Sequence, residues 1–313
     1  MSAKQLIPYC RSAIWGGSAF KEVFESSLEN IAEAWVWSVR EGKDSMLTDG
    51  TPIRNHLKEQ GFLGNLENPL LIKLLDAKDI LSVQVHPNDE AAFDLEGLSC
   101  GKTEMWYILC AEEGAYLYAG LSQGKAPFEA ALSRGEDPTP YLKKVFVKKG
   151  DVIYIPAGMA HAIGAGVRLL EVQQNSDTTY RVWDFLRKDS EGSFRELHKE
   201  KALAAAKDIK EEEIRAFRFE KGTDASFCQR AENAEISLLA NGRYFAAEKI
   251  SLQDGNATVF AKTPICAVVT DGTLCRDGTL CPQYTPLLLQ GETKIEGIGE
   301  LILCGNGEML CKE

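Results

Sequence analysis

Two of the four histidines in this 313-residue chain follow sequence patterns that are typical of metal ligands. The first lies in the segment Gln84-Val85-His86-Pro87. In a β-strand, Gln84 and His86 project from the same face because they are two residues apart, and Pro87 ends the strand because it has no N–H for the ladder. An amide oxygen and an imidazole would then lie side by side, which is half of a metal site. The alternative is an ordinary polar face at the end of a strand.

A carboxylate at the start of an apolar strand supplies a further candidate ligand. Glu104 precedes the run Met105-Trp106-Tyr107, where burial of an unpaired carboxylate is costly, so Glu104 needs a cation or a hydrogen-bond donor. Lys102 lies two residues earlier and shares the strand face of Glu104. The alternative is that the two side chains form an ion pair on a solvated strand edge.

The second histidine pattern runs from Gly150 to His161 and has the form G-D-x-x-x-x-P-x-G-x-x-H. Gly150-Asp151 predicts a tight turn into a strand, and Pro156-Ala157-Gly158 predicts a turn out of it. His161 then starts the next segment. This spacing is more specific than an isolated histidine, for which a buried position in the core is the alternative.

Together these patterns predict one metal ion per chain, bound by Gln84, His86, Glu104 and His161. Nitrogen and oxygen ligands suit Zn²⁺, Fe²⁺ or Mn²⁺, and we expect Zn²⁺. The set holds no thiolate and leaves coordination positions for water or substrate, which is typical of a catalytic site and not of a structural one.

Short strand-like runs rich in Val, Ile, Tyr and Trp must position these side chains. Gly, Pro, Asn or Asp separate the runs, and few helical segments lie between them, which favours an antiparallel sandwich or barrel. The expected strands are 34–40, 81–85, 104–110, 115–119, 142–147, 152–155 and 168–173. Helices are expected at 127–134 and 200–210, and 69–75 fits a strand or a helix.

The second half of the chain predicts a separate β-domain. The charged segment 207–215 is typical of a solvated helix end or a linker. Strands are expected to resume at 244–251, 258–260, 266–270, 285–289 and 301–304, with turns at the Asp-Gly pairs 254–255, 271–272 and 277–278. We therefore expect a catalytic metal-binding domain at 1–205, a charged helical linker at 206–235, and a β-domain without metal at 236–313, since no histidine follows His198.

Composition excludes several classes of protein. Apolar residues make up 44% of the chain and charged residues 26%, which is typical of a globular protein and not of a disordered or rod-like one. The net charge of −11 argues against nucleic acid or an anionic membrane as a partner. Neither a transmembrane helix nor a signal peptide is predicted. The nine cysteines are scattered without a Cys-x-x-Cys pair, so we expect reduced thiols in a cytoplasmic protein.

The pattern that ends at His161 resembles the second motif of the cupins, which are small metal-binding jelly-roll barrels. A closer resemblance covers about residues 8–205: the chain is similar to type I mannose-6-phosphate isomerases (phosphomannose isomerases) of the short bacterial kind. One departure is Ala32 before Glu33, where that family usually has glycine. The segments that carry the resemblance are Ile14-Trp15-Gly16-Gly17, Gln84-Val85-His86-Pro87, and the stretches 101–107, 156–162 and 171–184.

This resemblance implies both a fold and a reaction. The fold would be mainly β, with a cupin jelly-roll barrel as the catalytic domain, a few inserted helices, and a second, smaller cupin-like β-domain without metal. The reaction would be the reversible conversion of mannose 6-phosphate and fructose 6-phosphate through a cis-enediolate, with a hexose 6-phosphate as the small-molecule partner. A monomer or a homodimer is expected.

Isomerisation of a sugar phosphate requires cationic side chains that stabilise the enediolate and hold the phosphate. The candidates are Lys73, which lies in an apolar run, Lys102 and Arg181. The resemblance places the catalytic arginine in the segment of Arg181, which we expect in a loop. Its guanidinium stays protonated, which suits charge stabilisation or substrate positioning better than the role of a base. The alternatives are snorkelling for Lys73 and a surface ion pair with Asp177 or Asp184 for Arg181.

The general base is left open among Glu171, Asp177 and a Lys102 with a lowered pKa. His86 and His161 suit this role poorly if both bind the metal. Two other functions use a similar ligand set. An Fe²⁺-dependent cupin oxygenase would not need the three cations, which suit a phosphorylated substrate. A non-catalytic sugar-phosphate-binding cupin would bind the same ligand without turnover.

Overall fold

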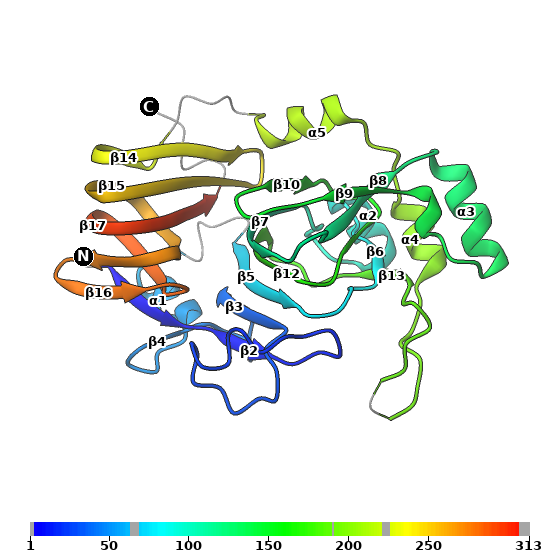
Figure 1. Cartoon of the computed structure of the whole chain (residues 1–313), viewed down its shortest axis with the longest axis horizontal. Coiled ribbons are helices and arrows are strands. Elements are labelled where there is room, and N and C mark those ends of the chain that lie inside the picture. Colours follow the sequence, from blue (N-terminus) through cyan, green and yellow to red (C-terminus); the bar gives the residue numbers. More distant parts are fainter. Residues whose placement is uncertain (1–2, 63–68, 190, 221–225, 307–313) are drawn as a thin grey trace. The chain divides into compact units, whose positions relative to one another are not determined.

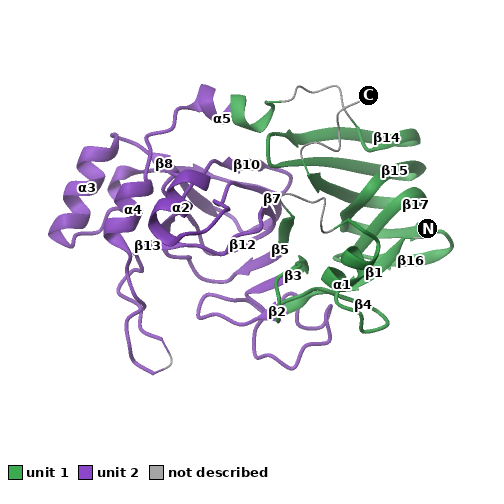
Figure 2. Cartoon of the chain, turned by 180° about the vertical axis from the view of Figure 1, so that it is seen from behind, with its two compact units in different colours: residues 1–9, 35–73, 216–313 green, residues 10–34, 74–215 purple. Residues whose placement is uncertain are grey.

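The computed structural model describes residues 3–62, 69–189, 191–220 and 226–306, and the chain divides into two compact units (Figures 1 and 2). Unit 1 comprises residues 1–9, 35–73 and 216–313, and unit 2 comprises residues 10–34 and 74–215. Both units are built mainly from antiparallel sheets, which confirms the predicted mainly β fold class.

The sheet of unit 1 has the strand order β14-β15-β17-β1-β4, and β16 also pairs with β15. Its strands are β1 (Lys4–Ile7), β4 (Met46–Leu47), β14 (Cys228–Asn241), β15 (Phe245–Arg276), β16 (Thr279–Pro282) and β17 (Pro286–Asn306), and its helix is α1 (Ile53–Glu59). Buried aliphatic side chains of β15 and β17, such as Val259, Val269 and Leu289, form the centre of its apolar core.

Two of the three Asp-Gly pairs do not form the predicted turns. Asp254-Gly255 and Asp271-Gly272 lie inside β15, where its register with β17 shifts. Asp254 (φ 52°) and Gly272 (φ 69°) have left-handed backbones, which here accompany bulges and not chain reversals. Only Asp277-Gly278 connects two strands, β15 and β16. The five strands expected in this region are therefore parts of two long, irregular strands, β15 and β17.

Unit 2 contains two antiparallel sheets, with the strand orders β10-β7-β12-β5-β3-β2 and β13-β6-β11-β8-β9. Trp106 and Leu169 from the first sheet share one buried cluster with Leu117 and Ile163 from the second, so the sheets pack face to face as predicted for a sandwich or barrel. The strands of the first sheet are β2 (Tyr9–Arg11), β3 (Glu33–Trp37), β5 (Leu70–Ala77), β7 (Glu104–Ala111), β10 (Val152–Ile155) and β12 (Val167–Gln174), of which β2, β3 and β5 are divided between the units. Those of the second are β6 (Val83–Val85), β8 (Tyr116–Leu121), β9 (Leu142–Phe146), β11 (His161–Ile163) and β13 (Tyr180–Trp183).

Both predicted helices, at 127–134 and 200–210, are present but differ in extent, and the structure adds helices that were not predicted. The helices other than α1 are α2 (Asp89–Glu96), α3 (Lys125–Arg134), the 3-10 helix Thr139–Tyr141, α4 (Lys199–Ala205) and α5 (Glu211–Arg218). The helix expected at 200–210 ends at residue 205, and the ambiguous segment 69–75 is part of strand β5. None of the described helices is long and apolar enough to cross a membrane.

The two units combine segments that are far apart in the sequence, whereas the predicted domains at 1–205 and 236–313 are continuous. Residues 1–9 and 35–73 group with the C-terminal strands of unit 1. The predicted linker at 206–235 contains α5 and the first half of β14. The continuous division therefore stays a prediction.

Pro87 and Asn88 fix the point at which β6 ends and α2 begins. Pro87 follows the last residues of the strand, and the side chain of Asn88 accepts a hydrogen bond from Ala91 N at 3.0 Å, which is the geometry of a helix N-cap. His86 is therefore held between a strand end and a helix start.

Candidate metal centre

Three of the four predicted ligands come together in unit 2. His86 directly follows β6, Glu104 starts β7 and His161 starts β11. One ligand atom from each lies within 4.8 Å of the others, and the three residues are at most 1% exposed. Within the described ranges of the chain, this is the only group of three or more His, Cys, Asp or Glu side chains that could hold a metal ion.

Strand pairing brings Gln84, the fourth predicted ligand, to the same place. His161 on β11 faces Gln84 on β6 in register, and Gln84 Nε2 lies 3.2 Å from His161 Nε2. The turn before His161 is tied to the first histidine, because Gly158 N donates a hydrogen bond to His86 O at 2.8 Å. Gln84 presents its amide nitrogen to His161, so binding of a metal through the amide oxygen requires a rotation of the amide group.

Both histidines point the same ring nitrogen into the cluster. His86 Nδ1 lies 2.9 Å from Thr178 O, and His161 Nδ1 lies 2.8 Å from Met159 O. A carbonyl oxygen only accepts hydrogen bonds, so each Nδ1 carries the proton and each Nε2 keeps its lone pair. These Nε2 atoms lie 3.6 Å (His86) and 3.5 Å (His161) from carboxylate oxygens of Glu104.

The donor set fits a divalent metal ion. Burial lowers the pKa of His161 to about 4, so its imidazole stays neutral at pH 7 and can act as a ligand without losing a proton. Two imidazole nitrogens and one carboxylate oxygen are a typical ligand set for Zn²⁺ and similar ions.

Lys102 lies beside these ligands. Its backbone N–H donates to Pro87 O at 2.9 Å, and its Nζ lies 2.9 Å from His86 Nε2. The ammonium group also donates a short hydrogen bond to Glu104 Oε2. Lys102 is 4% exposed, so it is a buried cation in contact with the cluster and not part of a solvated strand edge.

Glu171, one of the three candidate bases, is linked to His161 through Trp106. Glu171 on β12 faces Trp106 on β7 in register, and its Oε2 accepts a hydrogen bond from the indole N–H of Trp106 at 3.1 Å. The ring of Trp106 meets the ring of His161 edge-on, with 5.4 Å between centroids. Trp106 was not among the predicted site residues, although its position two residues after Glu104 places it on the same strand face.

Asp177 and Lys73, two further predicted site residues, differ in their exposure. Asp177 is an exposed residue after the end of β12. Lys73 belongs to unit 1, where it is 5% exposed and its Nζ lies 5.3 Å from the centroid of the Trp35 ring. The roles of Asp177 as a base and of Lys73 as a phosphate contact stay predictions.

Arg181 lies on a strand, β13, and not in the predicted loop. It faces Gln84 of β6 in register, and its Nε donates to Ser82 Oγ at 3.3 Å while its Nη1 donates to Glu196 O at 2.9 Å. Burial lowers the pKa of Arg181, and the positive charge of Arg195 lowers it further. The ordinary pKa of an arginine is so high that the guanidinium stays protonated at pH 7.

A buried carboxylate anchors the segment that holds Arg181. Asp184 accepts hydrogen bonds from Arg195 Nε and Arg187 Nη2, both at 2.7 Å, so it pairs with these two arginines. Three residues after Arg195, His198 N donates to the carbonyl oxygen of Arg181 at 2.7 Å. Asp184 was predicted only as a possible ion-pair partner of Arg181, and neither Arg195 nor His198 was among the predicted site residues.

Asp184→Asn is expected to lower the free energy of unfolding at pH 7 by roughly 1.5–3 kcal/mol, the value of a hydrogen bond to a charged group. Burial raises the pKa of Asp184, but the hydrogen bonds from Arg195 and Arg187 outweigh burial and hold that pKa below its ordinary value of 3.8. The ionised carboxylate therefore stabilises the fold above pH 3.8, and this stabilisation is lost as the pH falls below that value. Urea unfolding at a series of pH values should show the difference between wild type and Asp184→Asn shrinking below about pH 4.

The exposed carboxyl of Asp208 provides the control, Asp208→Asn, which should leave the free energy of unfolding nearly unchanged. A difference between wild type and Asp184→Asn that does not change with pH would contradict the ionic role of Asp184.

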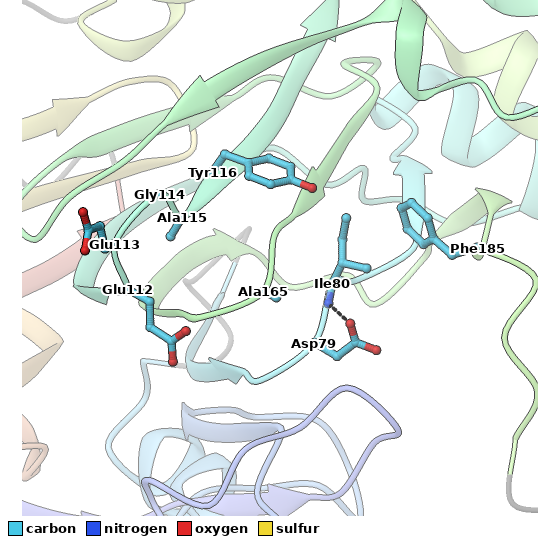
Figure 3. A pocket seen from close by; sticks show the side chains of 9 residues that line it. All are labelled: Asp79, Ile80, Glu112, Glu113, Gly114, Ala115, Tyr116, Ala165 and Phe185. Atoms are coloured by element: carbon cyan, nitrogen blue, oxygen red, sulfur yellow. Dashed lines mark hydrogen bonds between the residues drawn. The ribbon is translucent and has the colours of Figure 1, made fainter.

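A pocket elsewhere in unit 2 does not contain the candidate ligands (Figure 3). It has a volume of about 370 Å³ and is lined by Asp79, Ile80, Glu112, Glu113, Gly114, Ala115, Tyr116, Ala165 and Phe185. Its three carboxylates would repel a phosphate dianion, and Asp79 already pairs with Arg187 at 3.2 Å. The chemistry therefore points to the His86, Glu104 and His161 cluster and not to this pocket.

Comparison with known proteins finds similarity to mannose-6-phosphate isomerases, which are also called phosphomannose isomerases. A family model described as phosphomannose isomerase type I, catalytic domain, matches residues 4–98. The mannose-6-phosphate isomerase ManA of Bacillus subtilis (strain 168) is 40% identical over 206 residues, which are 63% of this chain and 65% of that protein. The match thus spans just under two thirds of the length of that relative.

Two further matches cover more of the chain. The probable mannose-6-phosphate isomerase GmuF of Bacillus subtilis (strain 168) is 33% identical over 279 residues, which are 85% of each protein. A crystal structure of the mannose 6-phosphate isomerase from Bacillus subtilis has a TM-score of 0.83 and 31% identity, and the match covers 97% of this chain and 100% of that one. Because these matches extend over nearly the whole of both chains, this chain belongs to the type I mannose-6-phosphate isomerase family.

Proposed function

We propose that this chain is a metal-dependent aldose–ketose isomerase that interconverts mannose 6-phosphate and fructose 6-phosphate. The observation that carries the proposal is the buried cluster of His86, Glu104 and His161. Lys102 contacts this cluster, and Arg181 lies on β13, which pairs with β6. Family membership supports the choice of substrate.

The ligands would be His86, Glu104 and His161, joined by Gln84 once its amide oxygen faces the cluster. Zn²⁺ at one site per chain fits this donor set best, and when bound it would supply Lewis-acid stabilisation of negative charge on substrate oxygens. The neutral imidazoles and the single carboxylate leave a bound Zn²⁺ with a net positive charge, which suits an anionic enediolate.

Arg181 would stabilise the charge that develops on the enediolate. Its Nε and Nη1 are held by Ser82 and the carbonyl oxygen of Glu196, so the guanidinium plane is oriented before substrate binds. A planar group that is fixed in this way stabilises a transition state without reorganisation. Lys102 would contact a substrate oxygen or the phosphate.

The proton transfer between the two carbons requires a base among Lys102, Glu171 and Asp177. Glu171 is 3% exposed and already accepts a hydrogen bond from Trp106. Asp177 is exposed and Lys102 is in contact with the ligands, so each candidate would need a different local movement to reach a substrate carbon. A pH–rate profile of each variant would separate them.

A coupled assay for fructose 6-phosphate formation, made together with metal analysis of the same purified protein, tests the proposed function. Activity with a stoichiometric divalent metal supports it. Oxygen uptake in place of isomerisation would indicate the cupin oxygenase, and sugar-phosphate binding without turnover would indicate a non-catalytic module.

The phosphate of the substrate is expected to matter strongly. The chain carries a net charge of −11, so a dianion must be attracted by local cations such as Lys102, Arg181 and the proposed Lys73. Free mannose should therefore have a much lower kcat/KM than mannose 6-phosphate, by at least about 10²-fold for the loss of charge-assisted contacts. Steady-state kinetics on both sugars measures this ratio, and a comparable kcat/KM would contradict the cationic lining.

The proposal also includes the compartment, the oligomeric state and the location of the metal. We expect a cytoplasmic enzyme that acts as a monomer or homodimer, with unit 2 holding the metal and the C-terminal strands of unit 1 holding none. Sedimentation analysis gives the oligomeric state, and two metal ions per chain would contradict the single site.

A further inference from the structure

The ammonium group of Lys102 and a metal ion in the cluster need the same atoms. Lys102 Nζ lies 2.9 Å from His86 Nε2 and donates a short hydrogen bond to Glu104 Oε2. Because His86 Nδ1 carries the ring proton toward Thr178 O, Nε2 has a single lone pair in the plane of the ring. That lone pair cannot accept a hydrogen bond from Lys102 and bind a metal at the same time, so the two arrangements exclude each other.

The backbone at Lys102 is held against the turn that follows His86. Lys102 N is hydrogen-bonded to Pro87 O, and a Cβ on the preceding Gly101 would lie 2.5 Å from the carbonyl carbon of Asn88. The backbone of residues 101 and 102 therefore packs closely against residues 87 and 88, which follow His86. Release of the ammonium group requires rotation of the flexible four-carbon side chain and no shift of the backbone.

The positive charge of Lys102 compensates the buried negative charge of Glu104. Glu104 is 0% exposed, and a buried carboxylate is stable only with a cation or several donors beside it. Lys102 forms an ion pair with this carboxylate and is itself 4% exposed, so the two opposite charges are buried together. A divalent cation bound by Glu104 would compensate the same charge.

We propose that Lys102 is an exchangeable cation of the metal centre. It takes the lone pair of His86 and compensates the charge of Glu104, and metal binding displaces its ammonium group from both atoms toward the substrate. Metal loading thus makes Lys102 available to substrate oxygens. This inference rests on the proposed metal site and does not depend on which sugar phosphate the enzyme uses.

Lys102→Met tests the competition because it keeps the length of the side chain and removes the ammonium group. Wild type and variant are stripped with a chelator and titrated with Zn²⁺ against a competing indicator. The variant should bind Zn²⁺ at least about tenfold more tightly, since no charge-assisted hydrogen bonds have to be broken. The matched control is Lys125→Met, whose ammonium group binds Leu203 O at 2.6 Å, and it should leave the Zn²⁺ affinity unchanged.

Thermal unfolding distinguishes two reasons why Lys102 could weaken Zn²⁺ binding. Either the metal displaces the ammonium group from His86 and Glu104, or the ammonium group only repels the metal. Displacement predicts that Lys102→Met lowers the Tm of the chelator-treated protein and leaves the Tm of the Zn²⁺-saturated protein unchanged. Repulsion alone predicts an unchanged Tm for the chelator-treated variant. That result, or a Zn²⁺ affinity no higher than that of wild type, would overturn the proposal.

A measurement on the unaltered protein covers the case in which Lys102→Met does not fold. Reductive methylation of lysines, followed by peptide mass spectrometry, should modify Lys102 at least about tenfold faster with saturating Zn²⁺ than with chelator, because the displaced amine leaves its hydrogen bonds. Equal or slower modification with Zn²⁺ would refute the displacement. Failure of wild type to bind Zn²⁺ at all would refute the metal site itself, which is a distinguishable outcome.

Discussion

His161→Ala is expected to remove the bound metal and to lower kcat/KM for mannose 6-phosphate by at least about 10³-fold, since a catalytic metal contributes several kcal/mol of charge stabilisation. His161 is 0% exposed and points its Nε2 at the carboxylate of Glu104. Alanine cannot bind the metal and leaves a cavity beside Trp106. Elemental analysis and steady-state kinetics on the same preparation measure both effects.

The control for this variant is His56→Ala, which removes a histidine of helix α1 in unit 1 that the proposed site does not use. It should keep both the metal and the activity. Circular dichroism is needed beside the metal analysis, so that loss of metal can be told from loss of fold. A folded His161→Ala protein that keeps its full metal content would show that the cluster does not bind the metal as proposed.

Arg181→Ala should keep its fold and its metal while kcat falls by about 10²–10³-fold, the cost of removing one donor that stabilises transition-state charge, or roughly 2.7–4 kcal/mol. Arg181 is oriented by Ser82 Oγ and Glu196 O and is not one of the metal ligands. An interaction made only in the transition state lowers kcat with little change in KM. Kinetics at saturating and at limiting substrate, together with metal analysis, test this pattern.

Arg181→Lys should recover little of the lost activity, because a point charge cannot replace a planar group held at both Nε and Nη1. Arg134→Ala provides the control, since Arg134 forms an exposed ion pair with Glu136 and should change neither kcat nor KM. If Arg181→Ala instead raises KM with a nearly normal kcat, Arg181 binds the substrate and does not stabilise the transition state.

The period of the β-strand made part of the cluster predictable. Residues two apart lie on one face of a strand, which relates Gln84 to His86 and places Lys102 next to Glu104 before any contact is known. The turn pattern before His161 predicted that this residue starts a new segment, and in the structure that segment is strand β11. Each of these features depends only on residues that are close together in the sequence, so a single sequence is enough to predict it.

Contacts between distant segments could not be predicted in the same way. Asp184 pairs with Arg187 and Arg195 and not with Arg181, because the chain returns after β13 and places residue 198 against residue 181. The Asp-Gly pairs inside β15 have the composition of hairpin turns, yet pairing with β17 makes them bulges. In both cases tertiary pairing, and not local sequence preference, decides the outcome.

The pairing of β1 with β17 inside unit 1 sets an order for folding during protein synthesis. Lys4 pairs with Leu288 in this ladder, so β1 leaves the ribosome long before its partner strand has been made. At about 5–20 residues per second, the interval is roughly 15–60 s. All residues of unit 2, which end at residue 215, are available well before β17 is complete. The residues of β1 that pair with β17 therefore wait unpaired throughout this interval, whereas Leu6 and Ile7 can pair with β4 as soon as it is made.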